Sequence, residues 1–268
     1  MFDIAKRWSM VIAMAAGFTL AGPLRAEDAP KTDTTKTEKP KADAPKPKPP
    51  QVKESAVVPK PRDAKWVKRH EGFLQDLKSH NGKVELLFVG DSITDGWRNG
   101  GKKVFAENFA DKYDTLNIGL SGDRTQHVLW RLENGEMEGI KPKLAMLMIG
   151  TNNLSGNTND EIVAGIDACV KEIQKLSPTT KVLLLGVFPR AHKTDDPAMH
   201  IPEKVKAVNE QLARLDDGKD VRYLDLAEKL APGGKLVPEY YTDNVHLTAK
   251  GYEVWADAID ARLKEMMQ

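Results

Sequence analysis

The chain has 268 residues, of which 40% are hydrophobic and 29% charged, enough for one sizeable globular domain or two small ones. Its 40 Lys and Arg residues against 39 Asp and Glu residues give a net charge of +1. This balance argues against nucleic acid or another strongly anionic partner. The single cysteine, Cys169, excludes an intrachain disulfide and a thiolate metal cluster, and its place in an apolar helical pattern is typical of a buried core residue.

Residues 1–26 have the layout of an export signal. Lys6 and Arg7 precede an apolar stretch over 8–22, and small residues then lead to Ala26. The apolar stretch is about 15 residues long, shorter than the roughly 20 that span a bilayer. We therefore expect cleavage near Ala26, a secreted or periplasmic protein and no stable membrane span. An uncleaved, membrane-anchored precursor is the alternative.

The composition then changes over residues 27–62 to Lys, Pro, Ala, Thr and Asp. Eight of the 16 prolines of the chain fall here, and large apolar residues are rare. Such a segment buries too little apolar surface to offset the entropy lost on ordering. We expect a disordered linker over 27–62, followed by a folded domain over 63–268. Contact of its lysines with anionic cell-surface polymers is disfavoured, because acidic residues are interspersed.

From residue 63 onward, helix-like and strand-like patterns alternate. A helix is expected over 63–79, and the apolar run 86–89 predicts a buried strand that stops at Gly90-Asp91-Ser92. Further strands are expected at 115–118, 144–149, 181–187 and 221–226, and further helices at 125–134, 160–176, 202–215 and 248–267. This alternation predicts an α/β fold with a mainly parallel sheet between two helical layers. The loops after the strands should therefore meet at one edge.

Ser92 directly follows the first predicted strand and is the candidate nucleophile. A serine hydroxyl needs a base to take its proton, and imidazole is the usual one. His246 precedes the last predicted helix, and Asp243, three residues earlier, can orient its ring. The alternative is that Asp91, Ser92 and Thr94 only cap a following helix.

Three groups at the same edge could stabilise the negative oxygen that forms during attack on an ester. They are the backbone N–H of Ser92, the backbone N–H of Gly122 and the side-chain amide of Asn152. A residue without Cβ lets its backbone approach a ligand closely, which suits Gly122. The alternatives are a plain turn glycine and a turn-capping amide.

Four sequence blocks, in order, resemble those of the SGNH (GDSL-like) hydrolases. They are Gly90-Asp91-Ser92, Gly122, Asn152 and Asp243-x-x-His246. The second block, over 122–136, is similar to that of the platelet-activating-factor acetylhydrolase type Ib catalytic subunits. The first block reads Gly-Asp-Ser-Ile-Thr in place of Gly-Asp-Ser-Leu.

The resemblance implies a flavodoxin-like three-layer α/β/α sandwich with five parallel strands. It also implies that Ser92 is the nucleophile, His246 the general base and acid, and Asp243 its orienter. Gly122 and Asn152 would complete the oxyanion hole with Ser92. The implied reaction is hydrolysis of a short acyl ester through an acyl-enzyme, with no metal and no organic cofactor. The branch includes dimers, so a homodimer is also an expectation.

Because the chain carries a predicted export signal, we expect an acetyl ester on a carbohydrate or polysaccharide as the substrate. The candidate substrate contacts are Asp91, Arg124, Asn153, Arg190 and Tyr241. Two alternatives remain open at this stage. One is a lysophospholipase or arylesterase of the same fold, and the other is a cell-surface polysaccharide-binding protein without useful catalysis.

Overall fold

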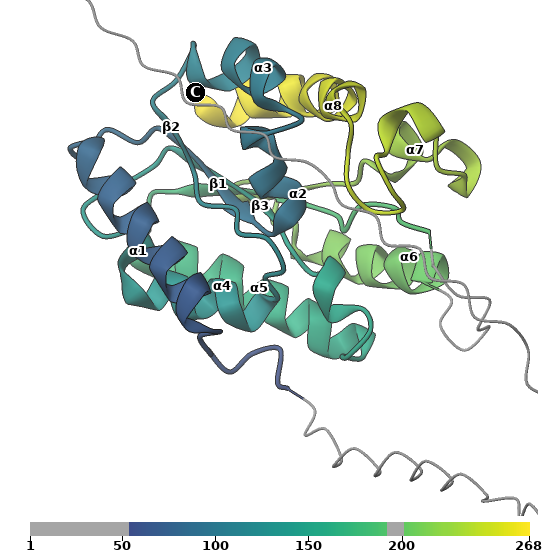
Figure 1. The fold of residues 1–268 in the computed structure, drawn as a ribbon, viewed down its shortest axis with the longest axis horizontal. Coiled ribbons are helices and arrows are strands. Elements are labelled where there is room, and N and C mark those ends of the chain that lie inside the picture. The colour runs from purple at the N-terminus through teal and green to yellow at the C-terminus, as the bar shows by residue number, and fades with distance from the viewer. Residues whose placement is uncertain (1–53, 192–200) are drawn as a thin grey trace, which may run out of the picture. The chain divides into compact units, whose positions relative to one another are not determined.

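The computed structural model describes residues 54–191 and 201–268 (Figure 1). The predicted export signal and most of the predicted linker lie outside these residues. Within the described ranges the chain forms one sheet with helices on both of its faces.

Five parallel strands form the sheet, in the spatial order β2-β1-β3-β4-β5. Their bounds are β1 Leu86–Gly90, β2 Thr115–Asn117, β3 Leu144–Met148, β4 Lys181–Leu185 and β5 Val221–Leu224. All five predicted strands are confirmed, most of them a residue or more shorter at the carboxyl end. In the register of the sheet, Leu86 of β1 lies opposite Thr115 of β2 on one side and Leu144 of β3 on the other.

The apolar strands are buried because each supplies side chains to two separate cores. Successive side chains of a strand point to opposite faces of the sheet. Leu87 and Val89 of β1 belong to one apolar cluster, whereas Leu86 and Phe88 belong to the other. Unbroken apolar runs, as opposed to alternating ones, are therefore what this sheet requires.

Helices cover both faces of the sheet, which confirms the three-layer α/β/α fold (Figure 1). One face carries α1 Ala64–Ser79, α4 Thr125–Arg131, α5 Asn159–Leu176 and α6 Ile201–Leu212. The other carries α2 Ser92–Asp95, α3 Lys102–Phe105, α7 Ala227–Leu230 and α8 Ala249–Met267. Short 3-10 or π-helical turns lie at Gly96–Arg98, Ala106–Ala110, Leu132–Glu136, Thr151–Asn153, Ala213–Leu215, Pro232–Gly234 and Pro238–Tyr240. Cys169 on α5 is fully buried, as predicted.

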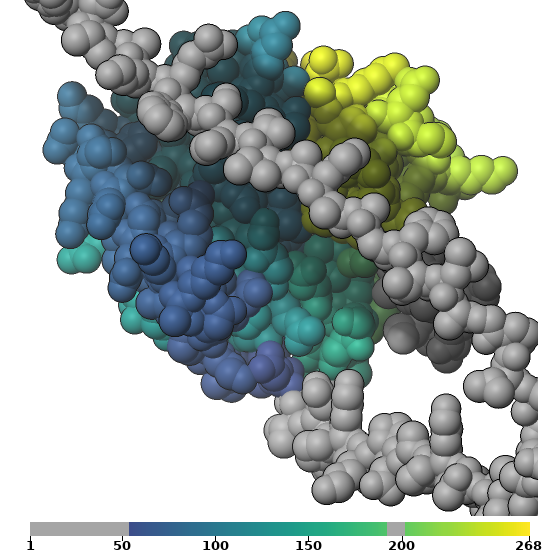
Figure 2. Space-filling view, viewed as in Figure 1, coloured from purple at the N-terminus to yellow at the C-terminus, as the bar shows by residue number. Residues whose placement is uncertain are grey.

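The segment 54–62, which we call the N-terminal strap, packs against the domain. Ala56 is only 2% exposed, and its carbonyl accepts a hydrogen bond from Thr125 Oγ1 at 2.7 Å. The backbone N–H of Lys60 donates to the Gln126 carbonyl at 3.1 Å. Figure 2 shows this purple end of the described chain against the rest of the folded part. The linker predicted over 27–62 therefore extends too far, because its last residues are held by hydrogen bonds to α4.

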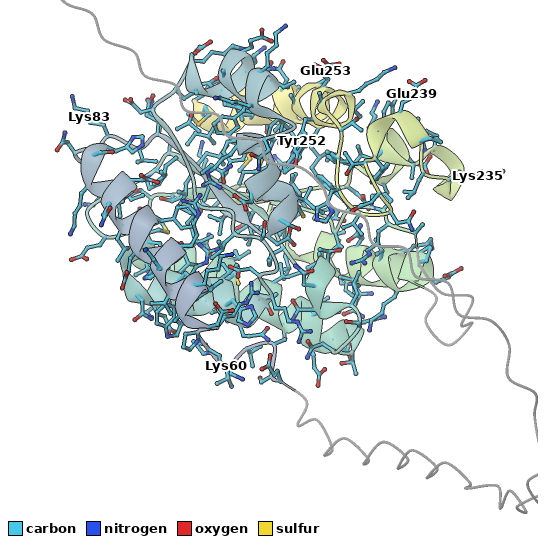
Figure 3. All side chains as sticks on the ribbon, viewed as in Figure 1. Lys60, Lys83, Lys235, Glu239, Tyr252 and Glu253 are labelled. Carbon is cyan, nitrogen blue, oxygen red and sulfur yellow. The ribbon has the colours of Figure 1, made fainter. Side chains whose placement is uncertain are left out.

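The strand order reverses at β1, which has β2 on one side and β3 on the other. Ligands of open α/β sheets bind at such a reversal, beyond the carboxyl ends of the strands. Gly90 ends β1 where a Cβ atom would lie 2.3 Å from the Met148 carbonyl oxygen, so only glycine fits. The chain then turns at once into α2, which α8 holds in place through a 2.7 Å hydrogen bond from the Tyr252 hydroxyl to the Ile93 carbonyl. Figure 3 labels Tyr252 among the side chains of the domain.

Candidate active site

Ser92, His246 and Asp243 form a continuous hydrogen-bonded chain. Ser92 Oγ lies 2.9 Å from His246 Nε2, and His246 Nδ1 lies 2.9 Å from Asp243 Oδ2. The imidazole and the carboxylate are 45% and 44% exposed, so the chain of groups opens to solvent. The fold thus brings together the three side chains that the sequence proposes as nucleophile, base and orienting carboxylate.

The turn that carries Asp243 is built around its carboxylate. Asp243 Oδ1 accepts hydrogen bonds from the backbone N–H groups of Val245, at 2.6 Å, and His246, at 2.8 Å. Partial burial alone would raise the pKa of Asp243, but the hydrogen bonds from His246 and Val245 outweigh it and lower that pKa to about 2. The carboxylate therefore stays ionised and can stabilise a protonated imidazole.

Tyr241 holds this turn against the rest of the domain. It pairs with Leu247 in an isolated antiparallel bridge, and the Thr242 N–H donates to the His246 carbonyl at 2.8 Å. The Tyr241 hydroxyl donates to the Pro189 carbonyl at 3.1 Å, and its side chain is only 7% exposed. Tyr241, a candidate substrate contact, is therefore a mostly buried support of the His246 turn.

Asp91 caps α2, as the alternative interpretation of this stretch proposes, while Ser92 next to it faces His246. Asp91 Oδ1 accepts the Ile93 N–H at 3.0 Å. The side chain is fully buried, and its Oδ2 has no hydrogen-bond partner within the described residues. Burial, reinforced by the nearby Asp123 carboxylate, raises the pKa of Asp91 to about 7. Asp91 therefore supports the nucleophile from beneath and is shielded from a bound substrate.

The loop after β2 lies against α2 and presents Gly122. Its Leu120 N–H donates to the Gly90 carbonyl at 3.1 Å, and Ser121 Oγ donates to Asp95 Oδ2 at 2.7 Å. Gly122 has a φ of 81°, in the left-handed region that favours glycine. Its backbone N–H has no acceptor among residues 54–191 and 201–268. This N–H is therefore available to an incoming ligand atom.

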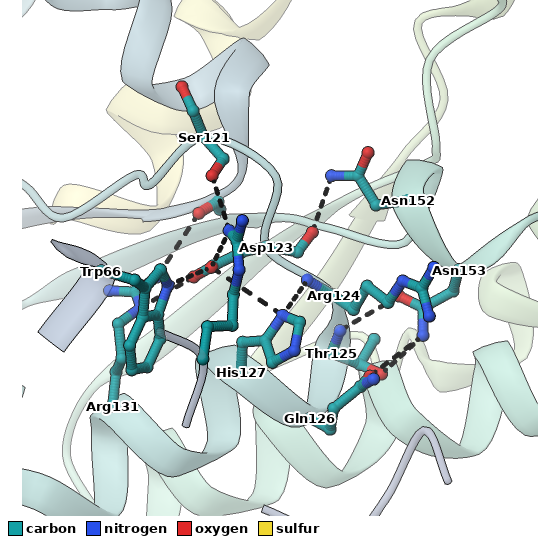
Figure 4. Close-up of polar contacts among 12 residues, drawn as sticks. Trp66, Ser121, Asp123, Arg124, Thr125, Gln126, His127, Arg131, Asn152 and Asn153 are labelled. Atoms are coloured by element: carbon teal, nitrogen blue, oxygen red, sulfur yellow. Dashed lines mark hydrogen bonds and ion pairs between the residues drawn. The ribbon is translucent and has the colours of Figure 1, made fainter. Parts of the chain in front are cut away.

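Asn152 links the loop after β3 to the loop after β2. Its Nδ2 donates to the backbone carbonyl of Asp123 at 2.7 Å, as Figure 4 shows. A side-chain amide carries two N–H bonds, so one remains for a ligand. Ser92, as the first residue of α2, also has a backbone N–H without an intrahelical partner. Each of the three predicted oxyanion donors thus has an N–H that its local structure leaves unused.

A buried ionic cluster lies beneath the loop after β2 and was not predicted from the sequence. Asp123 accepts hydrogen bonds from Trp66 Nε1 at 2.6 Å and from Arg131 Nε at 2.8 Å. Arg131 also pairs with Glu136, which bonds His70 Nδ1 at 2.8 Å. All of these side chains are almost completely buried. The cluster fixes the position of Asp123, and hence of the loop between Gly122 and the start of α4 (Figure 4).

The remaining predicted substrate contacts occupy different positions. Arg190 Nη1 donates to the Thr151 carbonyl and hydroxyl at 3.3 and 3.1 Å, beside the loop of Asn152. Arg124 is partly exposed, with its guanidinium 3.7 Å from Glu54. Asn153 is fully buried, and its amide bonds the Thr125 N–H, at 3.1 Å, and neighbouring polar side chains. Asn153 therefore joins the loop after β3 to α4. Its burial argues against contact with substrate.

The arrangement suits acyl transfer. A hydroxyl, an imidazole and a carboxylate lie in sequence, and N–H donors that could hold an oxyanion lie on neighbouring loops. Among the described residues, no group of three or more His, Cys, Asp or Glu side chains could hold a metal ion. In the same ranges, no helix is long and apolar enough to cross a membrane.

Comparisons with known proteins agree with this fold. The sequence model of the GDSL-like Lipase/Acylhydrolase family matches residues 88–254. The platelet-activating factor acetylhydrolase IB subunit alpha2 of Gallus gallus is 36% identical over 192 residues, covering 71% of this chain and 80% of the relative. The alpha1 subunit of Rattus norvegicus is 33% identical over 207 residues, covering 76% and 85%.

Solved structures share the fold at lower identity. A GDSL-like lipase from Bacteroides thetaiotaomicron superposes with a TM-score of 0.61 at 22% identity, covering 74% of this chain and 97% of that one. A carbohydrate esterase family 3 protein from Talaromyces cellulolyticus gives 0.52 at 17%, covering 69% and 98%. The chain belongs to the GDSL-like lipase/acylhydrolase (SGNH) family and is an ester hydrolase. Within that family its sequence places it in the branch of the platelet-activating-factor acetylhydrolase Ib subunits.

Proposed function

We propose that this protein is a serine esterase that removes acetyl and other short acyl groups through a Ser92-His246-Asp243 triad. The observation that carries the proposal is the pair of 2.9 Å contacts that joins these three side chains at the carboxyl end of β1. A pure binding protein would not need a nucleophile, base and orienting carboxylate in this sequence.

In the first step, Ser92 Oγ attacks the ester carbonyl carbon while His246 Nε2 takes the hydroxyl proton. The carbonyl π electrons move to oxygen, and the oxyanion accepts hydrogen bonds from Ser92 N–H, Gly122 N–H and Asn152 Nδ2. The ionised Asp243 stabilises the imidazolium. When the carbonyl re-forms, the C–O bond to the alcohol breaks and the alcohol oxygen takes the proton from His246.

The second step reverses these roles with water. His246 takes a proton from a water molecule, whose oxygen attacks the acyl carbon of the Ser92 ester. Collapse of this second oxyanion releases the carboxylic acid, and the proton returns from His246 to Ser92 Oγ. One ester and one water are consumed for each acid and alcohol formed, so the side chains end in their starting state.

The relatives support the choice of the acyl group. Proteins 33% and 36% identical to this chain are named acetylhydrolases, which agrees with the short acyl group, acetyl, expected from the sequence. The substrate in their name, platelet-activating factor, favours an ester in which the alcohol part is a lipid. The sugar acetyl ester expected from the predicted export signal is the second candidate. Export itself stays a prediction, because residues 1–26 lie outside the described part.

Hydrolysis of p-nitrophenyl esters from acetyl to octanoyl, by wild type and by Ser92→Ala, tests the proposal. We expect acetate to be cleaved fastest and only by wild type, with the variant as stable to heat as the parent. Full activity in Ser92→Ala would contradict the triad, and a preference for octanoate would contradict the short acyl group. Release of acetate from acetylated ether phospholipid and from acetylated xylan is then compared at equal acetyl content. This comparison distinguishes a lipid ester from a sugar ester as the preferred substrate.

A further inference from the structure

The N-terminal strap places a guanidinium, that of Arg62, against the loop after β2. Arg62 Nη1 donates to the backbone carbonyl of Ser121 at 2.8 Å and lies 3.5 Å from Asp123 Oδ1. The Arg62 side chain is 31% exposed, whereas that of Asp123 is fully buried. Arg62 therefore spans from the surface to the buried cluster and contacts the loop on the way.

The carbonyl that Arg62 holds belongs to the same peptide as the Gly122 N–H. The C=O and N–H of a planar trans peptide point in opposite directions. A hydrogen bond that fixes the Ser121 oxygen on one side therefore fixes the direction of the Gly122 N–H on the other. Glycine adopts a wide range of backbone conformations, so residue 122 does not by itself hold this peptide plane.

The guanidinium also occupies the space beside the Gly122 Cα. A Cβ atom built on Gly122 would lie 2.9 Å from Arg62 Nη1 and 3.2 Å from Nη2. Arg62 thus packs directly against the peptide that it holds. The loop cannot shift toward the strap without displacing the guanidinium.

The strap is itself anchored on both sides of its middle. Thr125 Oγ1 donates to the Ala56 carbonyl at 2.7 Å, and the Lys60 N–H donates to the Gln126 carbonyl at 3.1 Å. Asn157 Nδ2 donates to the Glu54 carbonyl at 3.0 Å. These bonds tie the strap to α4 and the neighbouring loop. The Arg62 side chain therefore projects from a backbone that is already fixed. Because the backbone is fixed, less conformational entropy is lost when the side chain is ordered.

We propose that Arg62 is a positioning residue, which orients the Ser121–Gly122 peptide so that the Gly122 N–H donates to the oxyanion. This inference rests on the proposed function, because it gives Gly122 the role of an oxyanion donor. It assigns a part in transition-state stabilisation to a segment that the composition of the chain marks as linker. Arg62 acts through Gly122 and does not itself touch the reacting atoms.

The test compares Arg62→Ala, Arg62→Lys and the control Lys60→Ala in the full chain with p-nitrophenyl acetate. Losing one oxyanion donor typically lowers kcat by about 10²- to 10³-fold, so a misdirected donor in Arg62→Ala should cost about 10-fold or more. KM and the pH midpoint of kcat/KM should stay near wild type, because the triad is intact. Arg62→Lys should recover part of the loss, since an ammonium can donate to the same carbonyl. Lys60→Ala removes an ion pair to Glu54 on the same strap and should keep full kcat.

A double substitution asks whether the effect passes through residue 122. Gly122→Ala places a Cβ against the guanidinium, so it should already disturb the contact that Arg62 makes. Adding Arg62→Ala to Gly122→Ala should therefore lower kcat by less than it does in wild type. Fully multiplicative effects of the two substitutions would contradict the coupling.

Two results overturn the inference while leaving the proposed function intact. One is an Arg62→Ala enzyme with wild-type kcat. The other is a loss that Lys60→Ala shares and that follows a lowered melting temperature, with KM and the pH midpoint also changed, since this describes general damage to the fold. A wild type that cleaves no ester would instead refute the proposed function, and this inference with it.

Discussion

Replacing Asp91 by Asn should make the protein more stable relative to the wild type at alkaline pH than at acid pH. The Asp91 carboxyl is fully buried, and burial raises its pKa from 3.8 to about 7. In the unfolded chain the group ionises near its ordinary pKa, so the folded state binds more protons between about pH 4 and 7. The free energy of unfolding of the wild type should therefore fall as the pH rises through that window.

The structure sets the size of this effect. A rise in pKa from 3.8 to about 7 corresponds to about 4 kcal/mol of lost stability once the group is ionised. Asn keeps an oxygen that can accept the Ile93 N–H, but its amide nitrogen replaces an oxygen that has no partner within the described residues. An unpaired buried polar group costs about 1–3 kcal/mol, and both the wild type and Asp91→Asn carry one at this position at any pH. Near pH 4.5 the wild type has lost only about 1 of the 4 kcal/mol, so between pH 4.5 and 8.5 Asp91→Asn should gain about 3 kcal/mol of stability relative to the wild type.

Urea unfolding of wild type and Asp91→Asn at pH 4.5 and 8.5 measures this directly. Asp257→Asn, which alters an exposed carboxylate on α8, is the matched control and should show no such change with pH. The same difference in unfolding free energy at both pH values would refute the reasoning, because it would mean that burial does not govern the ionisation of Asp91.

Three further substitutions test separate parts of the site. Asp243→Asn should lower kcat by about 10⁴-fold at pH 7, because an amide cannot stabilise the imidazolium as the ionised carboxylate, with its pKa of about 2, does. Asn152→Ala should lower kcat for p-nitrophenyl acetate by about 10²- to 10³-fold with little change in KM, because it removes a donor that acts in the transition state. Arg131→Met should lower the free energy of unfolding in urea by about 3–5 kcal/mol, because Asp123 and Glu136 stay buried without their shared cation.

Each of these expectations has a result that contradicts it. Near-normal turnover in Asp243→Asn would show that the carboxylate does not act on the imidazole. An Asn152→Ala enzyme with a raised KM and unchanged kcat would make Asn152 a ground-state contact. If Arg131→Met is no less stable than the control Arg214→Met, which alters an exposed side chain, the buried cluster does not support the loop.

The strands, and the meeting of Ser92, His246 and Asp243 at one edge of the sheet, could be predicted from the sequence. Buried parallel strands require unbroken apolar runs, and each run in this sequence becomes a strand. The small and polar residues that follow β1 and precede α8 then meet because parallel strands share one carboxyl edge. Ser92 and His246 lie far apart in the chain, yet topology alone brings them together.

Other features of the structure have no sequence pattern from which they could be predicted. The helices α2, α3 and α7 have four residues each, too few to show a helical period. The strap is held largely through backbone groups, so its polar, proline-rich composition hides its order. Arg131 and Glu136 look like solvent-facing charges in a helical pattern, although they pair in the interior. Asn153 stands next to Asn152, but the 3-10 turn directs its side chain inward.

The most direct test of the central claim is covalent labelling of the nucleophile. Diethyl p-nitrophenyl phosphate should phosphorylate one serine, and we expect intact mass and peptide mapping to place one diethyl phosphate on Ser92, with ester hydrolysis lost in step with labelling. His246→Gln should label far more slowly, because the base that activates the hydroxyl is gone. Adducts at another residue, or ester hydrolysis that continues after Ser92 is fully labelled, would contradict the account.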